Sequence, residues 1–154
     1  MKNITFLFLT LSLITCKSIL FDKKPPFKIT EASYKNWVGG QPGVQGINVY
    51  INYTSKNAVD FDSIYFRNQT GKLEIKKHPE TNLLVGYFNT STTNNKKDLL
   101  LQKGDMKPYN TTNTELKIPF ILKENEAVIS FTEAGTTKYY KVLNLKKEAS
   151  DFYP

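Results

Sequence analysis

The stretch INVYINYT, residues 47–54, alternates apolar and polar side chains with a period of two. In an extended strand, successive side chains point to opposite faces of the sheet. The apolar face of this segment would carry four side chains: Ile47, Val49, Ile51 and Tyr53. The alternation predicts a β-strand with one buried face and one face open to solvent, so the chain needs a fold that covers one side of a sheet.

The same short apolar pattern, bounded by turn residues, recurs along most of the chain. It marks residues 27–38, 61–66, 72–76, 83–88, 98–102, 116–122, 127–132 and 138–145. Pro119 would place 116–122 at a sheet edge, and Gly135 would allow the tight turn that completes a C-terminal three-stranded meander. About nine short strands without a helical repeat predict an antiparallel, immunoglobulin-like β-sandwich, with a small β-barrel as the alternative.

The N-terminus has the order of a secretory signal. Lys2 precedes an apolar run, residues 4–14, that is shorter than the roughly 20 residues needed to span a bilayer. We therefore expect a signal peptide at 1–15, an anchor and Pro-containing tether at 16–26, one domain at 27–147 and a C-terminal tail at 148–154.

Leu13-Ile14-Thr15-Cys16 resembles the lipobox of bacterial lipoproteins, with Leu13 and Cys16 at the matching positions and Thr15 where Gly, Ala or Ser is usual. The resemblance implies a diacylglycerol thioether on Cys16 and an acylated N-terminus, which together hold a protein stably on a membrane. Lys17 is not the Asp that marks inner-membrane retention, so the outer membrane is expected. The stretch YKNWVGGQPGVQGINVYI is also similar to short uncharacterised lipoproteins of flavobacteria-type bacteria, which supplies a setting and no mechanism.

Composition limits the possible partners. The chain is 40% hydrophobic and carries a net charge of +7, almost wholly from lysine, with Arg67 as its single arginine. The dispersed lysine pairs indicate a solvated surface, or a weak attraction to anionic lipid or polysaccharide. Nucleic acid is disfavoured, because its readers rely on Arg and on clustered basic patches. One cysteine allows no internal disulfide.

The residues needed for common catalytic and metal sites are few. His78 is the only histidine, so a zinc or copper site is excluded, and Asp60 and Asp62 lack the spacing of a calcium loop. No Ser lies in a GxSxG turn. Scattered acids suggest no defined pair: Glu31, Glu74 and Glu133. We therefore expect no enzyme, no catalytic residue, no metal and no cofactor.

Two segments could bind a ligand. The glycine-rich stretch 37–46 is either a wide turn between strands or a loop that presents Trp37, Gln41 or Gln45. It precedes a strand, which disfavours phosphate binding at a helix N-terminus. The polar face of 47–54 offers an aromatic ring between amides, suited to a sugar or simply to cross-strand packing: Asn48, Tyr50 and Asn52.

Asp62-Ser63-Ile64 resembles a short O-glycosylation motif of some bacteria, with Ser63 as the acceptor. Taken together, the sequence favours a non-catalytic, lipid-anchored envelope module that binds another envelope protein or a glycan. The alternatives are a carboxylate-dependent envelope hydrolase and a structural subunit of a membrane assembly.

Overall fold

The computed structural model describes residues 20–77, 81–91 and 118–154, and these contain nine strands. The described residues contain no helix, and so none able to cross a membrane. The predicted all-β fold is confirmed. The strands are β1 (Phe27–Val38), β2 (Gln45–Ser55), β3 (Asp60–Phe66), β4 (Gln69–Lys77), β5 (Asn82–Asn89), β6 (Ala127–Glu133), β7 (Thr136–Val142), β8 (Lys146–Lys147) and β9 (Asp151–Phe152).

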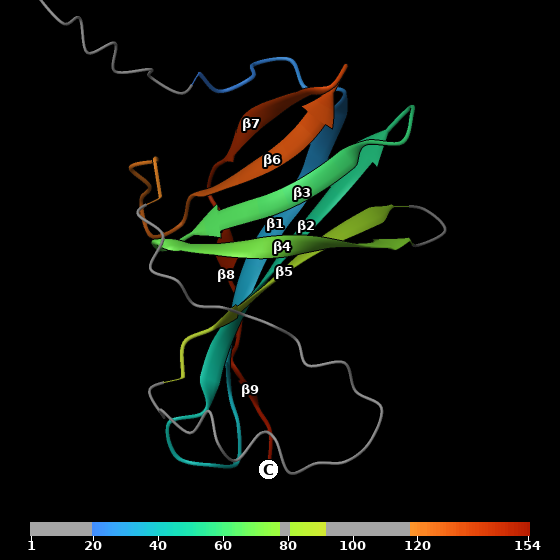
Figure 1. The fold of residues 1–154 in the computed structure, drawn as a ribbon. Helices are drawn as coiled ribbons and strands as arrows, with labels where there is room; N and C mark the ends of the chain where they lie inside the picture. Colours follow the sequence, from blue (N-terminus) through green and yellow to red (C-terminus); the bar gives the residue numbers. More distant parts are fainter. Residues whose placement is uncertain (1–19, 78–80, 92–117) are drawn as a thin grey trace, which may run out of the picture.

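The strands form one sheet in the order β7-β6-β3-β4-β5-β2-β1-β8, with β9 also paired to β1. β4 pairs with β3 over residues 69–72 and with β5 over residues 73–77. The sheet therefore folds across β4, and Figure 1 shows β6 and β3 passing in front of β1 and β2. The two layers of this sandwich-like fold are halves of one continuous sheet.

Aromatic side chains fill the space between the two layers. The ring of Phe27 lies 5.1 Å from that of Phe131 and 5.0 Å from that of Phe61, measured between centroids. Tyr34 and Phe66 join β1 to β3 at 5.2 Å. Such rings bury a large area and prefer the tilted and edge-to-face arrangements seen here. They hold the front and back layers together.

β2 has the two faces that its alternation predicts. The apolar side chains are buried, with 8% or less of their surface exposed: Ile47, Val49, Ile51 and Tyr53. The intervening Asn48, Tyr50 and Asn52 lie on the outer face and are partly exposed. The register that pairs β2 with β1 and β5 then fixes what lies beside each of them.

Residues 118–122 are irregular, so the strand predicted at 116–122 is wrong over this range, and the predicted meander lacks its first strand. The apolar alternation there has another cause. Phe120 is buried because it packs against Tyr65 and Tyr139, at centroid distances of 4.9 and 5.3 Å. The remainder of that prediction and the strand predicted at 98–102 lie outside the described residues.

Both ends of the described chain add to the sheet beyond the predicted limits 27–147. At one end, Phe21 forms a bridge with Tyr139, in a segment expected to be tether. At the other, the tail 148–154 contains β9, which runs parallel to β1. β8 is likewise parallel to β1, whereas all longer pairs are antiparallel. Two-residue strands carry no periodic signal, which is why the sequence did not reveal them.

We expect Phe131→Ala to lower the free energy of unfolding by about 3–5 kcal/mol, because it removes a fully buried ring from between the layers. The same change at Phe152, which is 77% exposed, should cost less than about 0.5 kcal/mol. Urea unfolding followed by circular dichroism measures both. Equal losses for the two variants would contradict this account of the core.

Candidate functional site

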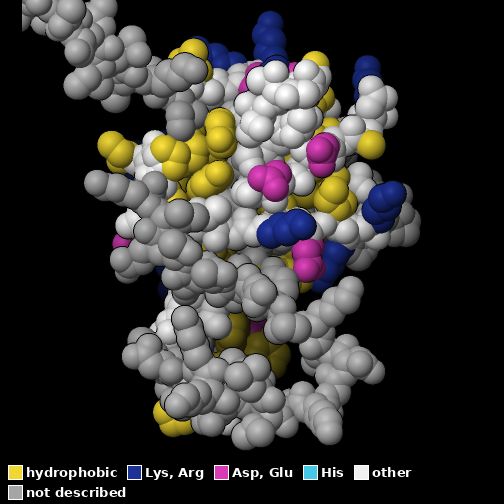
Figure 2. Space-filling view, in the orientation of Figure 1, with side chains coloured by type: hydrophobic (Ala, Val, Ile, Leu, Met, Phe, Trp, Pro, Cys, Tyr) yellow, Lys and Arg dark blue, Asp and Glu magenta, His cyan; other side chains and the backbone are white. Residues whose placement is uncertain are grey.

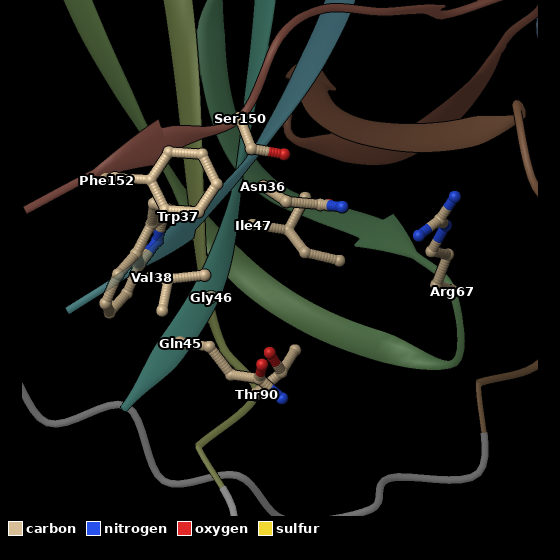
Figure 3. A pocket seen from close by; sticks show the side chains of 10 residues that line it. All are labelled: Asn36, Trp37, Val38, Gln45, Gly46, Ile47, Arg67, Thr90, Ser150 and Phe152. Carbon is tan, nitrogen blue, oxygen red and sulfur yellow. The ribbon is translucent and has the colours of Figure 1, made fainter. Parts of the chain in front are cut away.

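A cavity of about 270 Å³ lies where β1 ends and β2 begins, and Figure 3 shows the ten residues that line it. Strands β1, β2 and β9 supply most of them, and Arg67 and Thr90 come from the ends of β3 and β5. The cavity therefore gathers residues from five parts of the chain at one end of the sandwich.

Arg67 brings the positive charge. It lies in the two-residue turn between β3 and β4 with φ of 47°, followed by Asn68 with φ of 61°, a combination that suits a tight hairpin. Its Nη2 donates to the Tyr34 hydroxyl at 2.9 Å and its Nε to the Glu124 carbonyl at 3.3 Å. The guanidinium carbon lies 4.7 Å from the Tyr34 ring centre and 5.2 Å from that of Phe66.

These contacts fix the guanidinium without using all of its capacity. Arginine has five N–H donors, and the two bonds within the described part of the chain leave three available to a ligand. A stacked, weakly hydrated guanidinium is well suited to carboxylate or phosphate. The cavity can therefore recognise an anion.

Asn36 brings an acceptor. Its Oδ1 is buried and has no hydrogen-bond partner among the described residues. Figure 3 shows its side chain extending from β1 toward the side where Arg67 lies. A buried polar atom left unpaired costs about 1–3 kcal/mol, so such atoms are usually satisfied by water or a ligand. Asn36 thus has hydrogen-bonding capacity that no described residue fills.

Trp37 contacts β2 at Gly46. A Cβ atom at Gly46 would fall 2.4 Å from two carbons of the Trp37 ring, so only glycine permits this packing. Tyr153 meets the ring at 6.5 Å in an edge-on arrangement. The glycine at position 46 thus serves to seat Trp37 at the rim of the cavity.

The C-terminal segment is held on β1 by charge. Lys35 forms ion pairs with Glu148 at 3.5 Å and with Asp151 at 3.9 Å. A hydrogen bond from the Ser33 hydroxyl, together with Lys35, lowers the pKa of Glu148 below its usual value. This anchoring brings Ser150 and Phe152, which follow, to the cavity wall.

The structure divides the binding residues predicted from the sequence. Trp37 and Gln45 line the cavity. Gln41 is exposed in the connection between β1 and β2, where Gly39 N–H bonds to the Val44 carbonyl at 2.9 Å and Val44 N–H to the Gln41 carbonyl at 3.2 Å. The glycine-rich stretch therefore forms a turn whose base, and not its tip, contributes to the cavity.

The outer face of β2 is a separate surface. Asn48 Nδ2 donates to the Tyr50 hydroxyl at 3.3 Å, and Asn52 Nδ2 donates to Glu31 at 3.4 Å. The side chains along this strand therefore satisfy part of one another's hydrogen bonding, although Asn48 Oδ1 is buried and unpaired among the described residues. The bond from Asn52 to Glu31 joins β2 to β1, and a sugar site on this face stays a prediction.

The remaining predicted residues lie elsewhere. Ser63 is partly buried in β3, where its backbone N–H donates to Ser130 at 2.9 Å and its hydroxyl to Asp62 at 2.7 Å. Cys16 and His78 lie outside the described residues. Within the described ranges, no group of three or more His, Cys, Asp or Glu side chains could hold a metal ion.

Sequence reasoning missed most of the cavity. The one available signal was Arg67, a single arginine in a chain that otherwise uses lysine. The others had none, because ordinary polar and aromatic residues meet there only through strand pairing: Asn36, Thr90, Ser150 and Phe152. No family model, curated protein or solved structure matches the chain.

The turn at residues 123–126, whose Glu124 carbonyl accepts a hydrogen bond from Arg67, should loosen in acid. Glu126 is buried and accepts from Lys141 Nζ at 2.7 Å and from Lys123 N–H at 3.0 Å, and these bonds lower its pKa below the ordinary 4.5. A carboxylate whose pKa is lower in the folded protein than in the unfolded chain stabilises the fold at pH values above its ordinary pKa. This stabilisation is lost as the pH falls through the folded-state pKa. We expect Glu126→Gln to reduce the unfolding temperature at pH 7, with the difference from the wild type narrowing below pH 4.5.

Glu124→Gln is the matched control, because the exposed Glu124 contributes its backbone carbonyl to Arg67. Its unfolding temperature should follow that of the wild type across the pH range. A constant gap between the wild type and Glu126→Gln from pH 7 to pH 3 would show that ionisation of Glu126 has no part in holding the turn.

Proposed function

We propose that this protein is a lipid-anchored, non-catalytic binding module of the bacterial cell envelope, and that its cavity takes one acidic sugar unit of an envelope glycan. The observation that carries the proposal is that Arg67 and Asn36 both line one cavity. The first offers spare donors beside a positive charge, and the second offers a buried acceptor without a partner.

The chemistry of an acidic sugar matches this lining. Its carboxylate would accept hydrogen bonds from the Arg67 guanidinium, a charge-assisted contact of the stronger kind. A ring hydroxyl would donate to Asn36 Oδ1, and the apolar face of the ring would lie against Ile47 or Phe152. A cavity of about 270 Å³ suits one ring rather than a long segment.

The setting agrees with such a ligand. A net charge of +7 attracts polyanions and raises the rate at which they encounter the protein. The lipobox resemblance at Leu13–Cys16 supports anchoring at the outer membrane, where acidic glycans are at hand. Other envelope proteins would instead need a broad contact surface.

The anchor is tested by Cys16→Ala. Without the thiol no thioether can form, so we expect metabolic labelling with a fatty-acid analogue to fall to background and the protein to leave the membrane fraction. The wild-type chain, expressed and fractionated in parallel, is the control. Labelling that persists in Cys16→Ala would refute lipidation at this residue.

Ligand binding is tested by Asn36→Leu. Loss of one hydrogen bond to the ligand should weaken binding of a uronic acid oligosaccharide about tenfold, since a bond of about 1.4 kcal/mol is lost. Stability should stay the same or rise, because the substitution removes an unpaired buried acceptor. Isothermal titration calorimetry and urea unfolding measure the two effects.

Asn52→Leu is the matched control on the outer face of β2, and we expect it to bind as the wild type does. Arg67→Gln should bind the acidic oligosaccharide no better than its neutral counterpart, because the charge that distinguishes them is gone. Weakened binding in Asn52→Leu with normal binding in Asn36→Leu would move the site to the outer face and contradict the proposal.

A further inference from the structure

Two of the most exposed apolar side chains lie beside one stacked aromatic pair. Leu20 is 84% exposed and Ile121 is 99% exposed. Their neighbours Phe21 and Phe120 pack together with ring centroids 5.7 Å apart. We call the exposed Leu20 and Ile121, together with the partly buried Phe21 and the buried Phe120, the apolar patch. Figure 2 shows hydrophobic side chains gathered in the upper left of this face, near the place where Figure 1 draws residues 118–122 in orange.

The patch continues into an aromatic cluster. Phe120 contacts Tyr65 and Tyr139, whose rings lie 6.2 Å apart and are partly exposed. Rings with an apolar body and a polar tip are typical of the boundary between a membrane and water. The hydroxyl groups can remain hydrated while the apolar residues beside them leave water.

Several lysines lie close to the patch along the chain. Lys141 Nζ lies 5.9 Å from the centre of the Phe21 ring. Lys123, which follows residues 118–122, is exposed, as are Lys23 and Lys24 beyond Phe21. Lysine can extend its amine toward lipid headgroups while its stem lies on apolar surface. Lys141 is paired with Glu126 at 2.7 Å, so the positive charge offered to an anionic bilayer surface comes from the exposed Lys23, Lys24 and Lys123.

The short length of chain between Cys16 and Leu20 limits which surface the apolar patch can contact. Leu20 is four positions after Cys16, so even a fully extended backbone spans at most about 14 Å between them. We infer that the apolar patch rests on the same bilayer that holds the lipid on Cys16. This inference depends on the proposed anchor. The short connection brings the patch to the interface, and burial of Leu20 and Ile121 among the headgroups then fixes the orientation of the domain.

That orientation places the C-terminal end of β1 away from the membrane. β1 begins close to the patch, since Phe27 packs on Tyr140, the neighbour of Tyr139, at 5.5 Å. Its twelve residues end at Val38 on the cavity wall. A strand of this length spans about 36 Å. The part of the cavity formed by Val38 and Phe152 therefore lies far from the start of β1. Arg67 lies closer to the patch, because the Glu124 carbonyl that accepts its hydrogen bond is three residues after Ile121.

Quenching by brominated lipids tests the inference on the lipidated full chain. Two single-tryptophan variants share Trp37→Phe, one with Ile121→Trp in the patch and one with Phe152→Trp at the cavity. Both new positions are exposed, so the fold tolerates the change. Each protein is reconstituted in phosphatidylethanolamine and phosphatidylglycerol vesicles with or without bromine on the acyl chains, and association is checked by flotation.

We expect Ile121→Trp to lose about half of its emission in brominated vesicles, because an interfacial side chain sits about 5–10 Å into the headgroup and acyl boundary. Phe152→Trp should be unaffected. Flotation without quenching at position 121 would overturn the inference and leave the anchor intact. A protein that does not float with the vesicles would overturn the anchor and the inference together.

Discussion

β4 pairs with two different strands along its length, and the two-layered fold depends on this change of partner. Its first half pairs with β3 and its second half with β5. The layers can approach closely there because two glycines lack a Cβ. A Cβ on Gly86 would lie 2.6 Å from Cγ2 of Ile64 in the opposite layer, and one on Gly71 would lie 3.1 Å from the Tyr87 carbonyl oxygen. The aromatic core then fills the remaining space, with Phe27 meeting rings from both layers.

Most of the fold could be predicted from period-two alternation, because each long strand has one face in the core. The prediction for 27–38 matches β1 in both bounds, and that for 47–54 falls within β2. It failed at 118–122, where Phe120 is buried by stacking on neighbouring rings instead of by a strand. It also could not find β8 and β9, since parallel pairs of two residues depend on where the chain returns, and alternation does not encode that.

The candidate site was harder to predict, for the same physical reason. Glycines at 39–46 mark the end of a strand pair, which is why Trp37 and Gln45 were found. Asn36 gave no signal, because its distinguishing property, an unpaired buried oxygen, arises only when the surrounding strands close over it. Arg67 reaches the same cavity because the β3–β4 turn lies beside Tyr34 of β1. The sequence reveals which residue types are present, whereas the register of the paired strands determines which of them meet at the cavity.

The ion pairs formed by Lys138 near the start of β1 affect the position of the N-terminal segment more than the stability of the fold. Lys138 pairs with Asp22 at 3.1 Å and also with Glu133, and these groups are partly exposed, so the pairs contribute little free energy. Their main effect is on how far the domain can lie from Cys16. With Phe21 and Asp22 held against β7, the chain from Cys16 to Phe21 spans at most about 18 Å, but release of the chain as far as Phe27 would extend this span to about 40 Å. The contacts at Asp22 and Phe21 thus decide whether a lipid on Cys16 would orient the domain or merely tether it.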